Sequence, residues 1–167
     1  MRRSGRCTLP PCSILVAAPG SPALLLRPLA DRLVGVDLSP AMVAQAKSKQ
    51  LYDRLVTGDL TAFLKGEWDN RENYDLVVAA DVFVYVNDLA PVLAAAVLAP
   101  SGVFAFTVET HPGEGVKLLE TLRYAHSEPY IRRALSEAGL TAASLAKAAV
   151  RSEKGVPVDS LVVIARA

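Results

Sequence analysis

Four acidic residues stand just past apolar runs of the chain, a position in which an acid can bind a ligand. The runs are residues 33–36, 55–57, 74–80 and 103–108, and the acids that follow them are Asp37, Asp59, Asp81 and Glu109. A carboxylate beyond a strand can accept hydrogen bonds from both hydroxyls of a ribose, which suits Asp37, and an acid at Asp59 can accept from an adenine amino group. A single acid in such a place is an ordinary turn residue. Four of them at one end of a sheet favour a binding site.

Helix-forming segments alternate with these apolar runs. Residues 41–49 follow Ser39, a natural N-cap, and Pro40, which fits the first helical position. Further helical segments are expected at residues 61–65, 88–98 and 129–138. Parallel neighbours need crossover connections, so the alternation predicts an α/β fold. The sheet is expected to be Rossmann-like and mostly parallel, with helices on both faces.

The two ends of the chain depart from this alternation. Residues 141–150 and 158–164 are apolar with no helix-forming segment between them, so they are expected to form an antiparallel hairpin. Residues 1–23 contain Arg and Pro but no acid and form an atypical segment. Residues 24–167 are expected to form a single domain.

Composition excludes several classes of partner. The 167 residues carry a formal net charge of +1, which supplies no field to gather nucleic acid or an anionic membrane. No apolar run approaches the ~20 residues that span a bilayer. The two cysteines, Cys7 and Cys12, have no companion Cys or His at metal-ligand spacing. No metal site is therefore expected, and the chain is expected to be cytoplasmic.

The motifs around three of the acids resemble a known family. Residues 33–42 (LVGVDLSPAM), 58–60 (GDL) and 74–82 (YDLVVAADV) are similar, in this order, to the successive motifs of class I S-adenosylmethionine-dependent methyltransferases. The resemblance covers residues 24–167. Residues 123–127 (RYAHS), with the helical segment that follows them, are similar to bacterial TPR-repeat-type methyltransferases.

The resemblance implies S-adenosylmethionine as the cofactor and a role for the matching residues. Asp37 would hold the ribose, and Asp59 would bind the adenine amino group. Leu38 and Leu60 would enclose the adenine ring between them. The implied reaction is in-line attack of an acceptor nucleophile on the methyl carbon, with catalysis mainly by positioning and desolvation.

The sequence says less about the residues that would lie near the methyl group and its acceptor. By the same resemblance, the backbone at Ala80 and Asp81 would pass beside the methionine moiety. Tyr85 and Phe83 follow Asp81, and the sequence fits equally a wall beside the transferred methyl group and ordinary packing of two aromatic side chains. His126 precedes a helical segment and is a candidate base. Nothing in the sequence identifies the methyl acceptor.

One motif of the family is missing. Its members carry a glycine-rich turn after the first strand, where the backbone approaches the cofactor closely because glycine has no Cβ. Residues 13–22 (SILVAAPGSP) offer only Gly20, and two prolines there remove N–H donors. Rereading the codons of residues 11–23 from their third bases permits VLDLGCGTGLTG, which contains the missing motif. We therefore expect the segment before about residue 24 to be an out-of-frame reading, although residues 13–18 remain apolar enough to fill the central strand.

Two other functions stay open at this point. A nicotinamide-dependent Rossmann enzyme also uses a strand-end acid at Asp37, but it predicts neither the motif at residues 58–60 nor the terminal hairpin. A catalytically silent methyltransferase-like domain is the second alternative. Losing backbone donors at the first turn would weaken cofactor binding by ~1–3 kcal/mol for each unsatisfied polar group.

Overall fold

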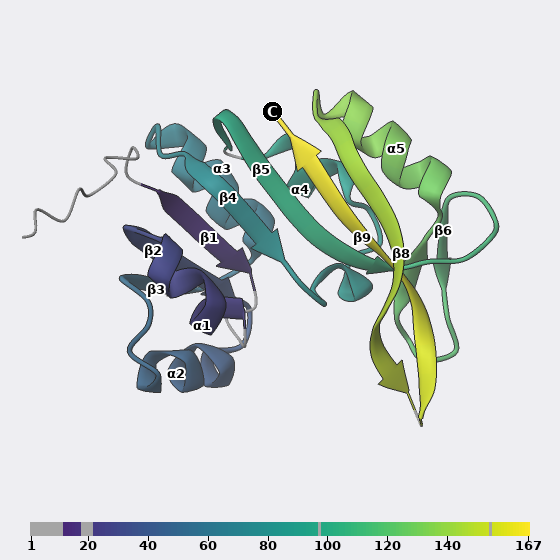
Figure 1. Cartoon of the computed structure of the whole chain (residues 1–167), viewed down its shortest axis with the longest axis horizontal. Helices are drawn as coiled ribbons and strands as arrows, with labels where there is room; N and C mark the ends of the chain where they lie inside the picture. Colours follow the sequence, from purple (N-terminus) through teal and green to yellow (C-terminus); the bar gives the residue numbers. More distant parts are fainter. Residues whose placement is uncertain (1–11, 18–21, 97, 154) are drawn as a thin grey trace, which may run out of the picture.

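The computed structural model describes residues 12–17, 22–96, 98–153 and 155–167. Within these ranges nine strands form one sheet (Figure 1). The strands are β1 (Ser13–Ala17), β2 (Arg32–Asp37), β3 (Arg54–Thr57), β4 (Tyr74–Ala79), β5 (Leu98–Glu109), β6 (Val116–Leu118), β7 (Tyr124–His126), β8 (Thr141–Glu153) and β9 (Val156–Arg166).

The sheet is parallel on one side and antiparallel on the other. Strands β3, β2, β1, β4 and β5 lie in this order, each parallel to its neighbours. Strand β9 then pairs antiparallel with both β5 and β8. The expected Rossmann-like, mostly parallel sheet with a C-terminal antiparallel hairpin is therefore confirmed.

Helices cover both faces of the sheet, as the sequence predicts. The helices are α1 (Pro22–Leu26), α2 (Pro40–Ser48), α3 (Leu60–Asp69), α4 (Ala90–Ala94) and α5 (Glu128–Glu137), with 3-10 turns η1 (Arg27–Leu29) and η2 (Phe83–Tyr85). Leu64 of α3, Leu93 of α4 and Leu135 of α5 belong to the larger buried cluster, on one face. Ala23 of α1 packs in a second cluster with Ile14 and other strand residues.

Strand β1 is built from the atypical N-terminal segment. Residues 14–17 are buried, and β1 lies between β2 and β4. The backbone N–H of Ser13 donates to Asp75 Oδ2 at 2.7 Å, which fixes the start of the strand. The apolar run thus fills the central position of the sheet as expected. The missing glycine-rich turn falls on residues 18–21, which lie outside the described residues, as do residues 1–11.

Helix α3 is longer than the turn expected at residues 61–65. It begins at Leu60 and runs on to Asp69. Phe63, Leu64 and Glu67 are buried along one side of the helix. Burial of that side stabilises a helix that local composition alone does not favour.

Helix α4 is shorter than the helix expected at residues 88–98. Leu98 is already the first residue of β5 and pairs with Tyr74 of β4. Residues 100–102 lie inside β5, where the register shifts and Ser101 has a φ of +66°. Strand pairing therefore takes over a segment whose composition favours a helix.

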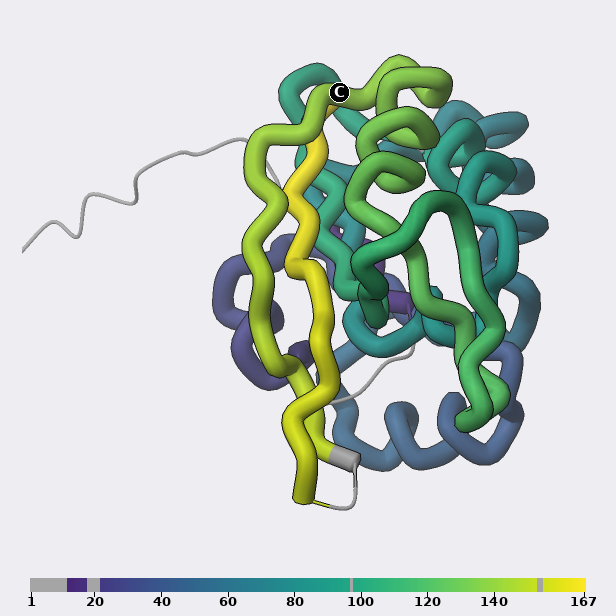
Figure 2. The backbone as a smooth tube through the Cα atoms, turned by 90° about the vertical axis from the view of Figure 1, so that its right-hand side faces the viewer, coloured from purple at the N-terminus to yellow at the C-terminus, as the bar shows by residue number. Residues whose placement is uncertain are grey.

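Two hairpins pair with the end of β5 at Glu109. The short β6–β7 hairpin, which the sequence analysis did not predict, joins β5 through Glu109 and Ala125. The long β8–β9 hairpin joins β5 through β9, where Glu109 pairs with Ser160, and stands apart from the β6–β7 hairpin in the side view (Figure 2). These two hairpins flank the end of the sheet where the acids were expected.

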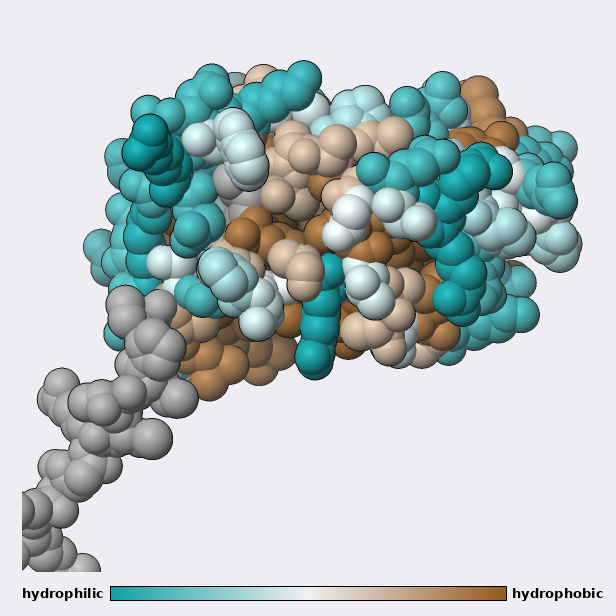
Figure 3. Space-filling model, turned by 90° about the horizontal axis from the view of Figure 1, so that it is seen from above, coloured by the Kyte–Doolittle hydropathy of each residue, from teal (hydrophilic) through white to brown (hydrophobic). Residues whose placement is uncertain are grey.

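Some of the apolar surface stays exposed. The view from above shows apolar side chains between two hydrophilic margins (Figure 3). Exposed large apolar residues include Leu24, Leu25 and Leu29 around α1 and η1. No helix in the described ranges is long and apolar enough to cross a membrane.

Candidate functional site

The four acids lie at the carboxyl end of the parallel strands, as expected. Asp37 is the last residue of β2 and pairs with Thr57 at the end of β3. The backbone N–H of Gly58 donates to the carbonyl oxygen of Asp37 at 2.9 Å, so Asp59 lies close beyond the end of β2. Ala79 on β4 pairs with Ala17 on β1, so Asp81 stands past the opposite neighbour of the central strand. We call this end of the sheet the carboxyl end.

Asp37 and Asp59 each have a structural task that uses one carboxylate oxygen. Asp37 Oδ1 accepts from the N–H of Ser39 at 2.8 Å, in the turn that starts α2. Asp59 Oδ1 accepts from the N–H of Ala62 at 2.8 Å and caps α3. Oδ2 of both residues has no hydrogen-bond partner among the described residues. One oxygen of each acid is thus left for a ligand.

Two leucines follow these acids with different degrees of burial. Leu38 is 71% exposed at the carboxyl end, whereas Leu60 is partly buried and packs against the main core. An exposed leucine beside two half-satisfied carboxylates offers both an apolar surface and hydrogen-bond acceptors. This combination suits a flat, amino-bearing ring.

Asp81 has an unusual backbone conformation at the end of β4. Its φ is +57°, in the left-handed region, and its N–H donates to Thr107 Oγ1 on β5 at 2.9 Å. Asp tolerates this region better than most residues because its short side chain bonds locally. Ala80 beside it is half-buried. The chain turns sharply here, which brings its backbone across the carboxyl end.

Glu109 differs from the other three acids because it is 4% exposed. Arg151 Nη2 donates to Glu109 Oε1 in a close ion pair, and Arg123 Nη1 lies 3.7 Å from the same oxygen. Arg151 Nε also lies 3.8 Å from Asp81 Oδ1. Sequence reasoning missed both arginines, which come from the turn before β7 and from β8. Glu109 is therefore occupied by ion pairs within the chain.

The two aromatic residues of η2 take different places. Phe83 is fully buried, and its ring centroid lies 5.2 Å from that of Phe106. Tyr85 is 65% exposed, and the Arg123 guanidinium carbon lies 5.6 Å from its ring centroid. Tyr85 thus stands at the carboxyl end with one ring face against Arg123, while Phe83 belongs to the core.

His126, the candidate base, is completely buried. Its Nε2 lies 2.9 Å from the carbonyl oxygen of Val86, which can only accept, so Nε2 carries the proton. Burial lowers the pKa of His126 and keeps the ring neutral. Its ring centroid lies 5.6 Å from that of Tyr130. This placement fits a structural contact to the loop after β4 better than contact with substrate.

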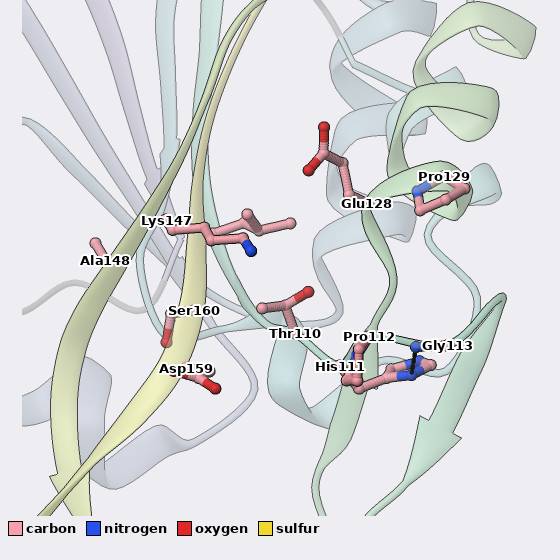
Figure 4. Close-up of a pocket in the computed structure, with 11 residues that line it drawn as sticks. Thr110, His111, Pro112, Gly113, Glu128, Pro129, Lys147, Ala148, Asp159 and Ser160 are labelled. Carbon is pink, nitrogen blue, oxygen red and sulfur yellow. Dashed lines mark hydrogen bonds between the residues drawn. The ribbon is translucent and has the colours of Figure 1, made fainter.

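A pocket of about 700 Å³ lies among the loop after β5, α5 and the β8–β9 hairpin. Its lining includes Thr110, His111, Glu128, Lys147 and Asp159, which come from the loop after β5, from α5 and from the β8–β9 hairpin (Figure 4). None of Asp37, Asp59 and Asp81 lines it, so we do not place the cofactor there. The described part of the chain contains no group of three or more His, Cys, Asp or Glu side chains that could hold a metal ion.

Comparison with known proteins identifies the family. A family model described as a methyltransferase domain matches residues 16–106, which is more than half of the chain. The chain belongs to this methyltransferase family. The match includes the Asp37, Asp59 and Asp81 motifs and ends before Glu109.

Solved structures resemble this methyltransferase over most of its length. An S-adenosylmethionine-dependent methyltransferase from Mesorhizobium loti has a TM-score of 0.71 at 19% identity, covering 94% of this chain and 91% of that chain. Magnesium protoporphyrin IX methyltransferase from Synechocystis PCC 6803, with bound S-adenosylmethionine, has a TM-score of 0.69 at 19% identity, covering 95% and 71%. These likenesses show a common fold. No curated protein matches the chain.

Proposed function

We propose that this methyltransferase uses S-adenosylmethionine, bound at the carboxyl end of the sheet. The observation that carries the proposal is the pair of acids, Asp37 and Asp59, on adjacent strands. Gly58 N–H links the two strand ends, and each acid keeps one carboxylate oxygen without a partner in the described chain. A ribose and an adenine amino group offer the donors that these two oxygens lack.

The residues present fit the cofactor on the described side of the site. Asp37 would accept from the ribose hydroxyls and Asp59 from the adenine amino group, while Leu38 and Leu60 would contact the ring. The backbone at Ala80 and Asp81 would border the methionine part, as the family resemblance implies. When bound, S-adenosylmethionine supplies a methyl group on a positively charged sulfur, which is open to attack by a nucleophile.

The chain's own contribution to catalysis is positioning and exclusion of water. Tyr85 borders the acceptor side of the carboxyl end in this proposal. We leave His126 out of the catalytic groups because it is buried and its Nε2 is held by Val86. In this proposal the acceptor brings a nucleophile that needs no base from His126.

The finer parts of the proposal rest on the sequence. Residues 123–127 and the helix after them support the similarity to TPR-repeat-type methyltransferases. The net charge of +1 supports a small-molecule or protein acceptor over nucleic acid. The scarcity of cysteine supports a cytoplasmic location.

Calorimetry of the full chain with S-adenosylhomocysteine and, separately, with NAD tests the proposed function. We expect S-adenosylhomocysteine to bind and NAD not to bind. Binding of NAD alone would overturn the proposal, because a strand-end acid at Asp37 serves both cofactors.

A catalytically silent methyltransferase-like domain is the second candidate, and the sequence of residues 13–22 favours it. This stretch has one glycine and two prolines where the family has a glycine-rich turn. A weak or absent response to S-adenosylhomocysteine in a folded chain would support this candidate over the first.

A further inference from the structure

Trp68, the only tryptophan of the chain, lies in water rather than in the core. It is near the end of α3, and 71% of the residue is exposed. Tryptophan carries a large apolar ring, and such rings are enriched where one protein binds another. The surroundings of Trp68 indicate what covers it.

A hollow of about 470 Å³ lies beside Trp68, where α3 meets α4. Both helices lie on the same face of the sheet (Figure 1). On the α4 side the hollow is lined by Pro91, Ala94 and Ala95, which share one side of the helix because they are three and four positions apart. Their short side chains leave space that a large ring can fill. We call this region the α3–α4 surface, and it consists of Lys65, Trp68, Asp69, Pro91, Ala94 and Ala95.

The α3–α4 surface combines a projection with a hollow of matching character. The ring of Trp68 is large, apolar and exposed, and short apolar side chains line the hollow next to it. A surface with both parts can bind a copy of itself, because a twofold axis places the projection of each copy over the hollow of the other.

The charges of the α3–α4 surface are complementary to themselves as well. Lys65 and Asp69 are exposed, lie about one turn apart on α3 and border the hollow. Neither has an ion-pair partner in the described part of the chain. When two copies of α3 lie antiparallel across a twofold axis, Lys65 of each copy comes next to Asp69 of the other. The charge pattern therefore favours an antiparallel contact between two copies.

From these observations we propose that the α3–α4 surface binds a second copy of the chain, in a twofold dimer in which Trp68 of each copy enters the hollow of the other. The net charge of +1 adds little long-range repulsion between copies. Asp59 caps the opposite end of α3, ~13 Å along the helix from Trp68, so the dimer leaves the carboxyl end of the sheet open. The inference does not depend on the proposed function.

Sedimentation velocity of the full chain, from about 5 µM to about 500 µM, tests the inference. The average molar mass is expected to rise with concentration from that of one chain towards that of two. A chain that stays monomeric at the highest concentration overturns the inference, and so does assembly that continues beyond the dimer, because a twofold contact closes on itself.

Fluorescence locates the contact, because Trp68 is the only tryptophan. As the dimer forms, the Trp68 ring leaves water, so its emission should move to shorter wavelengths and acrylamide should quench it less. A dimer that forms with no change in emission or quenching overturns the inference, since Trp68 would then lie outside the contact.

Trp68→Ala removes the projection and should weaken self-association at least about tenfold. The variant should fold, because the side chain is exposed and alanine favours helix. The control Leu25→Ser removes a leucine that is 78% exposed on α1, on the other face of the sheet, and should leave self-association unchanged. Equal self-association in Trp68→Ala and the unchanged chain overturns the inference.

A charge exchange tests the antiparallel arrangement. Lys65→Glu places a like charge next to Asp69 of the second copy and should weaken self-association about three- to tenfold, whereas adding Asp69→Lys should restore it. Removing a charge without reversing it has a smaller effect, since exposed pairs are weak. Molar mass in solution is the readout, because a change in helix stability alone does not alter it. If the double variant does not recover, the antiparallel contact is wrong and the inference falls.

Discussion

Asp37 combines a turn contact with the proposed ribose contact, and a substitution separates the two. In a chain that carries a restored glycine-rich turn, Asp37→Ala should weaken S-adenosylhomocysteine binding by roughly 1.5–3 kcal/mol, the range for hydrogen bonds to a charged group. The free energy of unfolding should fall only slightly, since the variant loses a single part-buried hydrogen bond from Ser39 N–H. Calorimetry and chemical denaturation measure the two effects.

The control for this prediction is Asp69→Ala. Asp69 is exposed at the last turn of α3, far along that helix from its cap, and its loss should change neither binding nor stability appreciably. If Asp37→Ala unfolds the chain instead, Asp37 acts as a structural cap for α2. The assignment of Asp37 to the ribose would then be withdrawn.

Individual acids could be located from the sequence because each follows its own strand. Asp37, Asp59 and Asp81 could be located because an apolar run, and the residue that ends it, lie within a few residues of each acid. Their partners could not be located in the same way. Glu109 and Arg151 are 42 positions apart and meet only because the β8–β9 hairpin folds back onto β5 through β9. A buried ion pair of this kind depends on tertiary topology, which no local pattern reports.

The loop after β4 is held by two hydrogen bonds, one from β7 and one from α5. Because one of them comes from a histidine, the free energy of unfolding should depend on pH. His126 Nε2 donates to the Val86 carbonyl oxygen, and Tyr130 OH accepts from the N–H of Leu89 at 2.8 Å. Burial lowers the pKa of His126, so its ring takes up a second proton less readily in the folded chain than in the unfolded chain. The free energy of unfolding should therefore fall as the pH drops below the unfolded value of about 6.5, until the pH passes the folded pKa.

Chemical denaturation across this pH range checks the prediction, with His126→Gln as the comparison. Glutamine can still donate to Val86 but does not titrate, so the variant should lose the part of the pH dependence that belongs to His126. The same pH dependence in both chains would show that other groups cause it.

Tyr130→Phe should destabilise the chain by about 1 kcal/mol at every pH through loss of its bond to the Leu89 N–H.

Elements could be predicted where local signals and packing agree. Helix α2 begins after Ser39, whose Oγ accepts from the N–H of Met42, as its N-cap and proline signals indicate. Helix α5 ends before Gly139, which has a φ of +73°. The lengths of α3 and α4 could not be predicted, because the packing of Phe63 and the pairing of Leu98 with Tyr74 outweigh local composition.

At the scale of the whole molecule, the fold could be predicted while the state of its binding site could not. Alternating strands and helices dictate a parallel sheet, and the apolar residues 14–17 fill its centre whatever reading frame produced them. The central strand packs into the core as long as its side chains are apolar and of suitable size. Cofactor binding requires backbone N–H donors and space, which only the glycine-rich turn after the first strand supplies. The chain can thus keep the sheet of a methyltransferase and still bind its cofactor poorly.

Restoring the alternate-frame sequence VLDLGCGTGLTG over the codons of residues 11–23 tests this separation of fold from binding. The glycines would let the backbone approach the cofactor, and the N–H donors that Pro19 and Pro22 lack would return. Each satisfied polar group contributes ~1–3 kcal/mol, so the affinity for S-adenosylhomocysteine, measured by calorimetry, should rise at least about tenfold. Chemical denaturation of both chains measures the free energy of unfolding separately, because the restored sequence also places an aspartate and a glycine in the central strand. Equal cofactor affinity in the two chains would contradict this account, since the first turn would then have no part in holding the cofactor.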